Sequence, residues 1–386
     1  MGYTSPIRKF VNPEIVYGSG AMRLAGQYAR TFGAGRVLVV SDPGVIEAGW
    51  AGRVVSSLDE AGIASVIFSA VSPNPRDFEV MNGAELYRSS GCDAIIVVGG
   101  GSPMDCAKGI GIVSTSHCHI LECEGVDNVL NPMPPLICIP TTAGTSADVS
   151  QFAIINNPAE RVKIAIVSKS TVPDVALIDP ETTTTMNPYL TACTGMDALV
   201  HAIEAYVSNA SSPLTDLHAL QAVRLIGANL LAAIAEPHNM AARDAMMLGS
   251  LEAGLAFSNA SLGAVHAMAH SLGGYLDLPH GECNALLLEH VIAYNYTAAA
   301  ERFYDIAVAL DIPEHSLGGG NCLASLTKAI RSLRITAGIT GSLQTVGVTS
   351  DVIPILAGKA MKDACMVTNP RRPSRADIES IYEQAL

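Results

Sequence analysis

Short apolar runs rich in β-branched residues alternate with longer helical patterns from the N-terminus to about Pro180. Two of these runs, at residues 37–40 and 94–98, are apolar throughout and are followed by polar residues or glycine. Such runs are typical of parallel strands buried on both faces, because a strand with one face in water would alternate apolar and polar side chains. The strand–helix–strand repetition predicts a doubly wound α/β domain with right-handed crossovers.

The pattern changes after Pro188, where alanine, leucine and methionine replace the β-branched runs, as at residues 214–235 and 241–256. This half is expected to be all helical. A chain of 386 residues with 49% hydrophobic and 15% charged residues is long and apolar enough for two buried cores. We therefore expect a Rossmann-like α/β domain at residues 1–186 and an all-α domain at residues 187–386.

The charge and the cysteine content narrow the class of protein. A net charge of -13 argues against nucleic acid or an anionic membrane as a partner. No apolar run reads as a clean membrane span, and residues 1–12 lack the apolar core of a signal peptide. The nine cysteines are scattered without the spacing of a disulfide framework. These features predict a cytoplasmic protein without membrane or nucleic-acid partners.

Metal-ligating residue types are concentrated in the helical half. Asp197 and His201 are four residues apart, and so are His266 and His270, which places each pair on one face of a predicted helix. His280 follows between a proline and a glycine. A carboxylate with several imidazoles suits a divalent transition metal such as iron or zinc. The alternative is a set of histidines packed in the helical core.

Two polar loops in the first half each follow a predicted strand. The first, at residues 99–105, is rich in glycine and leads into a helix, and the second, at residues 140–146, is rich in threonine. Glycines permit close backbone approach, and free amides at a helix start can hold a pyrophosphate. The usual G-x-G-x-x-G pattern is absent, so a glycine turn without a ligand is the alternative. Two such loops at strand ends favour nucleotide binding.

Asp42 ends the first of the buried runs, and two interpretations of its carboxylate remain open. It can accept a hydrogen bond from a ribose 2′-hydroxyl and repel a 2′-phosphate, which favours NAD over NADP. Alternatively, it caps the turn that begins at Pro43 and Gly44.

These motifs together resemble the iron-containing (group III) alcohol dehydrogenases, which have the dehydroquinate-synthase-like fold. The resemblance extends from Gly18 to Arg371 and is most specific in GGGSPMD, PTTAGTS, TGMDALVHAIEAY and VHAMAHSLGG…PHG. It implies four metal ligands: Asp197, His201, His266 and His280. His270 matches a histidine that lies beside the substrate without binding the metal.

The resemblance also implies a cofactor, NAD, and a set of residues that bind it. Positions that contact the dinucleotide in relatives correspond to Asp42, Asn74, Gly100, Gly101, Thr142, Thr145, Ile154 and Lys163. Their loop neighbours Ser102, Asp105 and Thr141 complete the expected cofactor-binding set.

The chain departs from the family pattern at two places. The usual Ser-Glu-Val after the threonine loop is here Ala147, Asp148 and Val149, and the usual threonine before His201 is Val200. Neither departure touches an expected ligand. Because both could alter the substrate pocket or the loop over the nicotinamide, the family resemblance does not identify the substrate.

The function that the resemblance implies is a metal-dependent alcohol dehydrogenase acting on a small primary alcohol or aldehyde. Fe²⁺ is the expected metal, with Zn²⁺ as the alternative, and the protein is expected to form a homodimer or larger homo-oligomer. His270 is expected to relay the hydroxyl proton, with a purely structural histidine as the alternative. Competing functions are a glycerol- or diol-type dehydrogenase, a dehydroquinate-synthase relative, and a regulatory protein that binds NAD and metal with little turnover. A synthase should place more lysine and arginine around a phosphorylated substrate, and the helical half is poor in both.

Overall fold

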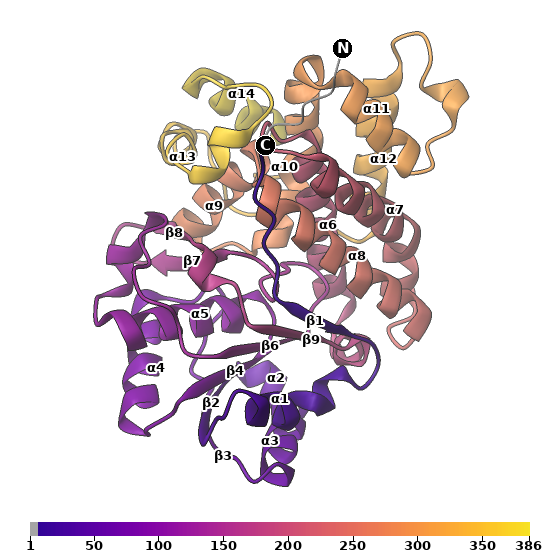
Figure 1. Ribbon diagram of the computed structural model, residues 1–386. Helices are drawn as coiled ribbons and strands as arrows, with labels where there is room; N and C mark the ends of the chain where they lie inside the picture. The colour runs from indigo at the N-terminus through magenta and orange to yellow at the C-terminus, as the bar shows by residue number, and fades with distance from the viewer. Residues whose placement is uncertain (1–6) are drawn as a thin grey trace.

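The computed structural model describes residues 7–386, so the first half of the segment examined for a signal peptide, residues 1–6, lies outside the described residues. The chain begins in a layer built around a parallel sheet and ends in a layer of packed helices (Figure 1). The last strand of the described residues ends at Ile178, and the first long helix of the second half begins at Pro188.

The principal sheet is parallel throughout, with the order β1-β9-β6-β4-β2-β3. Its strands are β1 (Glu14–Tyr17), β2 (Arg36–Val40), β3 (Ala64–Phe68), β4 (Ala94–Gly99), β6 (Leu136–Pro140) and β9 (Val175–Ile178). Leu38 and Val40 face one apolar cluster, whereas Val37 and Val39 face another. Both faces of the central strands are therefore buried, which is why residues 37–40 and 94–98 are apolar at every position.

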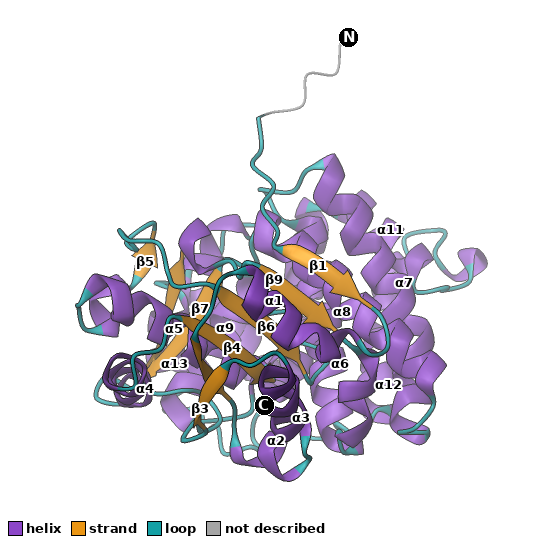
Figure 2. Cartoon of the chain, turned by 60° about the horizontal axis from the view of Figure 1, so that its bottom comes forward, coloured by secondary structure: helices purple, strands orange, loops and turns teal. Residues whose placement is uncertain are grey.

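Helices cover the two faces of this sheet, and the strands lie between them (Figure 2). Side chains of α1 (Ala25–Thr31) and α3 (Trp50–Glu60) pack on one face, and those of α4 (Asp77–Ser89) and α5 (Gly101–Ser116) pack on the other. The doubly wound fold expected from the sequence is confirmed. A short helix, α2 (Pro43–Glu47), follows β2 directly.

The strand order reverses beside β2. The chain goes from β2 to β3 on one side, then returns to β4 on the other side. In open parallel sheets, ligands bind in the crevice outside the carboxyl ends of the strands at such a switch point. The loops that leave β2 and β4 at this edge begin at Ser41 and Gly100.

A second, three-stranded sheet interrupts the strand–helix alternation, which the sequence pattern did not predict. It has the order β5-β8-β7 and contains β5 (Gly125–Val126), β7 (Phe152–Asn157) and β8 (Val162–Val167). β7 and β8 are antiparallel, whereas β5 and β8 are parallel. The hairpin packs closely against α9 of the helical half. A Cβ at Gly274 would lie 2.7 Å from the backbone nitrogen of Lys163.

The second half of the chain is helical, as expected. Its α-helices are α6 (Pro188–Val207), α7 (Pro213–Ala235), α8 (Met240–Ala260), α9 (Ala264–Leu276), α10 (His280–Asn295), α11 (Ala300–Ala309), α12 (Cys322–Thr336), α13 (Ile353–Ala360) and α14 (Arg375–Ala385). Short 3-10 helices lie at Ala21–Leu24, Ile120–Cys123, Lys169–Thr171, Pro180–Thr185, Tyr296–Ala298, Glu314–Ser316 and Ala364–Thr368. One apolar cluster joins the α-helices of the second half into a common core.

α7 is the one helix of the described residues that is long and apolar enough, by length and composition alone, to cross a membrane. The sequence analysis expected no such run. One face of α7 belongs to the core of the helical half, where Ala222, Val223, Ile226 and Leu230 are fully buried. A core helix passes the same test, so the finding is weak evidence for a membrane span.

Candidate metal centre and nucleotide cleft

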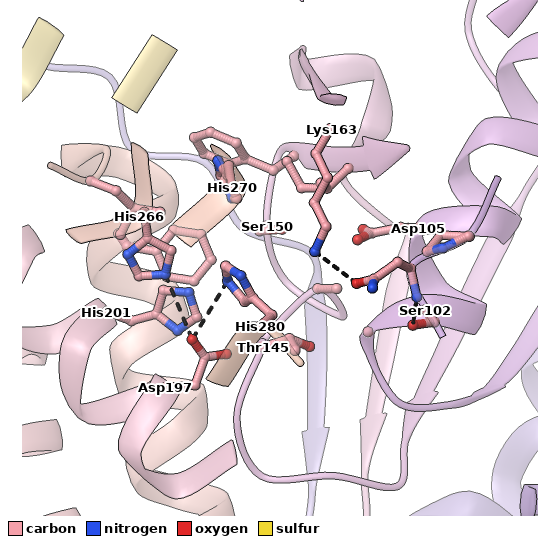
Figure 3. Close-up of a pocket in the computed structure, with 18 of the residues that line it drawn as sticks. Ser102, Asp105, Thr145, Ser150, Lys163, Asp197, His201, His266, His270 and His280 are labelled. Atoms are coloured by element: carbon pink, nitrogen blue, oxygen red, sulfur yellow. Dashed lines mark hydrogen bonds and ion pairs between the residues drawn. The ribbon is translucent and has the colours of Figure 1, made fainter. Parts of the chain in front are cut away.

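Three helices bring the expected metal ligands to one point. Asp197 and His201 come from α6, His266 from α9 and His280 from the first position of α10. Each of the four offers a ligand atom, and these atoms lie within 4.8 Å of one another. Asp197 Oδ1 is 3.7 Å from His266 Nε2 and 3.6 Å from His280 Nε2 (Figure 3). Ligand atoms around a tetrahedral ion, with bonds of about 2.1 Å, are about 3.4 Å apart.

Local sequence explains how each helix reaches this point. Asn187 caps α6 by accepting a hydrogen bond from Leu190 N at 2.8 Å, and Pro188 occupies the first helical position. α10 begins immediately against α6, because a Cβ at Gly281 would lie 2.3 Å from the Cys193 carbonyl oxygen. Only glycine permits this approach, so the residue after His280 sets how closely the two helices pack.

Glu204 orients His266, and the sequence analysis did not identify it. Its carboxylate accepts a hydrogen bond from His266 Nδ1 at 2.7 Å and another from Val265 N at 2.7 Å. The first bond turns Nε2 toward Asp197, and the second caps the start of α9. The sequence signal was its position on α6, seven residues after Asp197, which places a buried carboxylate on the ligand-bearing face.

Three of the four ligand side chains are already in the ionisation state that binds a metal. Burial alone would raise the pKa of Asp197, but His201 and His280 lower it below its usual value. Burial lowers the pKa of His201 to about 3 and that of His280 well below its usual value, so both rings are neutral. Burial opposes protonation of His266, yet the carboxylates of Asp197 and Glu204 raise its pKa to about 9. His266 must therefore release a proton when a cation binds.

The donor set fits a divalent transition metal. It consists of one carboxylate and three imidazoles without a thiolate, held by rigid helices and buried or half-buried. Imidazole with carboxylate suits iron and zinc, whereas calcium and magnesium require mainly oxygen ligands.

A cavity connects this centre to the sheet half of the protein. The lining residues that the sequence analysis singled out are Asn74, Gly101, Ser102, Asp105, Thr145, Ala147, Ile154, Lys163, Asp197, His201, His266, His270 and His280. The ligand-type residues lie on one side of the cavity, and Ser102, Asp105 and Lys163 lie on the other (Figure 3). The geometry thus places the expected metal ligands opposite most of the expected cofactor-binding residues.

The glycine and threonine loops lie against each other at the sheet side. A Cβ at Gly101 would be 2.8 Å from Thr145 Cγ2, and one at Gly100 would be 3.1 Å from Thr142 Cγ2. Thr141 N donates to the Gly99 carbonyl at 3.0 Å. Gly100, Thr141 and Thr142 belong to these loops but do not line the cavity.

Asp42 also lies outside the cavity lining. It caps α2, since Oδ1 accepts a hydrogen bond from Val45 N at 3.0 Å. One of the two carboxylate oxygens of Asp42 therefore caps α2, as the capping interpretation expects. Its position after β2, at the switch point of the sheet, is also where a ribose would approach.

A series of hydrogen bonds between side chains crosses the cleft on the sheet side. Lys163 Nζ donates to Asn74 Oδ1 at 2.7 Å, and Asn74 Nδ2 donates to Asp277 Oδ1 at 2.8 Å. Asp277 ends α9 in the helical half and also pairs with Arg76 at 3.1 Å. Burial raises the pKa of the nearby Asp105 to about 7, against the lowering effect of Lys108.

His270 lies beside the metal ligands without joining their cluster. Its Nδ1 is 2.8 Å from Asp363 Oδ2, and its ring stacks on that of His280 at 5.3 Å. Burial would raise the pKa of Asp363, but the His270 ring lowers it. Asp363 is 93 residues away in sequence, and no motif indicated it.

Comparisons with known proteins identify the family of the chain. Residues 12–180 match the family described as iron-containing alcohol dehydrogenase, and residues 191–386 match the C-terminal part of the Fe-containing alcohol dehydrogenase family. The chain is 42% identical to 1,3-propanediol dehydrogenase of Citrobacter freundii, covering 96% of each chain. It is 37% identical to NAD-dependent methanol dehydrogenase of Bacillus methanolicus, covering 98% of this chain and 99% of that one.

A solved structure of 1,3-propanediol oxidoreductase superposes with a TM-score of 0.95 and 40% identity, covering 99% of this chain and all of the other. The chain belongs to the iron-containing alcohol dehydrogenase family. Its expected fold class, its activity as an alcohol dehydrogenase and its use of iron and NAD are confirmed at the level of this family.

The apolar end of this dehydrogenase cavity was not predicted. Phe152, Phe257 and Leu262 line it, and the Phe257 ring stacks on His201 with centroids 4.3 Å apart. The first lies on the hairpin and the other two lie at or just beyond the end of α8, so their convergence depends on how the hairpin docks.

Of the residues at the two departures from the family pattern, Ala147 lines the cavity, whereas Asp148 and Val200 lie behind its surface. Val200 is fully buried in the helical core, and Asp148 is buried beneath the threonine loop. Neither is among the residues that line the cavity. Burial raises the pKa of Asp148 to about 6, against the lowering effect of its own backbone amide and of Lys108. Any influence of Asp148 and Val200 on the substrate must act through the residues packed on them, whereas Ala147 can act directly.

Proposed function

We propose that this protein is an NAD-dependent, iron-dependent dehydrogenase that interconverts a small primary alcohol and its aldehyde. The observation that carries the proposal is one cavity with two chemically distinct walls. Asp197, His201, His266 and His280 converge on one wall, and the glycine and threonine loops form part of the other. A carbinol carbon held at the first wall would face a nicotinamide held at the second.

The protein's own residues would hold the metal, orient its ligands and move a proton. When bound, a ferrous ion supplies Lewis acidity that lowers the pKa of an alcohol hydroxyl. Asp197, His201, His266 and His280 would hold it, with Glu204 keeping the Nε2 atom of His266 turned inward. His270 would take the hydroxyl proton outward, because its ring lies at the cavity and its Nδ1 is anchored on Asp363.

We assign residues 1–186 to nucleotide binding and residues 187–386 to metal binding and catalysis. The family-specific matches fall on either side of this boundary, at 12–180 and 191–386. Asp42 would face the adenosine ribose at the switch point, with Asn74, Ile154 and Lys163 nearer the nicotinamide. The protein would act in the cytoplasm as a homodimer or larger homo-oligomer. Its net charge of -13 disfavours nucleic acid and anionic membranes as partners.

A short diol is a second candidate substrate. The names of a 42% identical relative and of a structural neighbour at TM-score 0.95 both refer to 1,3-propanediol. The cavity offers an apolar end at Phe152 and Phe257 and polar groups at Ser150 and Asp105. An unsubstituted alkyl chain suits the first end, and a second hydroxyl requires a hydrogen-bond partner such as the second end provides.

Metal exchange with a substrate panel tests the proposal. Apoprotein refilled anaerobically with Fe²⁺ is expected to oxidise 1-propanol or 1,3-propanediol with NAD faster than apoprotein refilled with Zn²⁺. Zinc favours four-coordinate geometry, which four protein ligands already supply, whereas iron accepts further ligands more readily. Exposure to air should inactivate the iron form. Equal rates with both metals would refute iron as the active metal, and no turnover of any alcohol or aldehyde would refute the enzyme.

A further inference from the structure

Asn284 lies at the centre of the ligand cluster, although no family motif or spacing argument singled it out. It is on α10, one helical turn after His280, and it is fully buried. Its Nδ2 atom is 2.6 Å from Asp197 Oδ1, 3.1 Å from His266 Nε2 and 3.2 Å from His280 Nε2. One amide nitrogen therefore touches three of the four groups that would hold the metal.

The chemistry of the contacts determines which end of the carboxamide faces the cluster. The shortest contact joins Asn284 to a carboxylate oxygen, which can only accept, so the amide nitrogen must be the donor. The opposite orientation would place two oxygen atoms 2.6 Å apart without a hydrogen between them. Asn284 Oδ1 is buried and has no hydrogen-bond partner within residues 7–386. The two amide hydrogens can therefore serve two of the three ligand atoms, while the amide oxygen remains unsatisfied.

His280 Nε2 has one lone pair, so it cannot accept a hydrogen bond from Asn284 and bind a cation at the same time. A metal held by Asp197 and His280 would place its positive charge beside Asn284 Nδ2, which is 2.6 Å from Asp197 Oδ1 and 3.2 Å from His280 Nε2. The amide hydrogens carry partial positive charge, so the cation would repel them at this distance. Either the carboxamide hydrogen-bonds to His280 Nε2 or the cation binds this atom.

We propose that Asn284 is a placeholder amide, which holds the ligand groups in position when no cation is bound and withdraws when one binds. The inference rests on the metal site proposed above. The amide stabilises the cation-free protein by about one charge-assisted hydrogen bond, and this bond is lost on metal binding. Asn284 therefore keeps the site assembled, and it weakens the equilibrium affinity for the metal.

The proposal fixes the sign of a measurable change. A side chain that stabilises only the cation-free form lowers metal affinity by the same free energy, because folding and binding are linked. Removing the amide should destabilise the cation-free protein and tighten metal binding. A ligand role for Asn284 Oδ1 would give the opposite sign, since its removal would weaken binding. A packing role would lower the stability of both forms equally and leave the affinity unchanged.

The experiment uses Zn²⁺ as a redox-inert probe and compares Asn284→Leu with the wild-type full-length protein. Leucine is similar in size and has no hydrogen-bond donor. Zn²⁺ affinity is measured by competition with a chromophoric chelator, and thermal unfolding is measured with and without Zn²⁺. The expected result is about tenfold tighter Zn²⁺ binding, equivalent to the loss of one such hydrogen bond. The melting temperature should fall more without Zn²⁺ than with it.

Asn295 provides a matched control on the same helix. It is also a buried asparagine, and its Nδ2 donates to Asn369 Oδ1 at 2.9 Å, away from the ligand cluster. Asn295→Leu should lower the melting temperature equally with and without Zn²⁺ and leave the affinity unchanged. If Asn284→Leu does not fold, Asn284→Ala replaces it.

Each outcome decides the proposal. Weaker or unchanged Zn²⁺ binding by the variant overturns the placeholder role and leaves the metal site standing. A wild-type protein that binds neither Zn²⁺ nor Fe²⁺ overturns the metal site and the placeholder together. Tighter binding that appears in Asn284→Leu and is absent from Asn295→Leu supports the proposal.

Discussion

Replacing Glu204 with glutamine should separate metal affinity from the integrity of the fold. Glutamine keeps the size of the side chain, removes its charge and converts one acceptor oxygen into an NH₂ group. The two carboxylate oxygens accept from different donors, Oε1 from Val265 N and Oε2 from His266 Nδ1, each at 2.7 Å. In either orientation of the glutamine amide, one of these donors would face an NH₂ group.

The magnitude follows from the buried position of both contacts. Glu204 is only 3% exposed, so water does not replace a lost acceptor. An unsatisfied buried donor costs about 1–3 kcal/mol, and losing the negative charge at the start of α9 costs about 0.3–1 kcal/mol more. The metal-free variant should lose about 1–4 kcal/mol in the free energy of unfolding.

Metal affinity should fall further than this stability loss alone suggests. If the amide nitrogen faces His266, the ring must carry its proton on Nε2, the atom that is turned toward Asp197. Loss of a partner that orients a ligating histidine typically costs about 10–100-fold in metal affinity. Chelator competition with Zn²⁺ measures the affinity, and urea unfolding of the metal-free protein measures the stability.

A second carboxylate–histidine pair supplies the control. Glu252 is hydrogen-bonded to His218 Nδ1, and neither residue lines the cavity. Glu252→Gln should retain wild-type Zn²⁺ affinity. If Glu204→Gln also retained wild-type affinity while losing stability, Glu204 would be only a helix cap, and the reasoning on the orientation of His266 would be refuted.

Three further predictions concern other parts of the cleft. Asp42→Asn should accept NADP better than the wild type while keeping the cap on Val45 N, whereas Asp42→Ala should also lose about 1 kcal/mol of stability; unchanged NADP kinetics in both would leave Asp42 as a cap only. The pKa of Asp105 is raised to about 7, so the folded wild type holds a proton that the unfolded chain has released, and its stability should fall as the pH rises from about 4 through about 7. Asp105→Asn should lack this loss in urea unfolding across that window, and parallel curves for both proteins would contradict the assignment. His280→Ala should stay folded with sharply reduced metal content by elemental analysis, and full occupancy would remove His280 from the ligand set.

Local spacing in the sequence was sufficient for the class of fold and for much of the metal centre. Apolar runs such as 94–98 predict strands buried on both faces, because a strand places successive side chains on opposite faces. The four-residue spacing of Asp197 and His201 places both on one face of α6, because a helix turns once in 3.6 residues. Both inferences depend on backbone geometry within a few residues, so they survive without knowledge of the tertiary structure.

Family resemblance, more than spacing, separated the ligands from their neighbours. His266 and His270 have the spacing of a ligand pair, but the structure places only His266 in the four-residue cluster, while His270 turns to Asp363. The pair lies on one helix, and its two rings differ in what the neighbouring elements present to them.

Tertiary packing alone decided the partners that make the site work. Glu204 meets His266 across 62 residues, and Asn284 meets Asp197 across 87. The hairpin of β7 and β8 brings Phe152 and Lys163 into the cavity from outside the strand–helix pattern. Such contacts depend on the angles and distances at which helices and sheets pack, and these are set by the summed burial of many side chains instead of by any short segment. The chain's local pattern therefore indicates which residues can bind a metal, and the packing of α6, α9 and α10 determines how they are oriented.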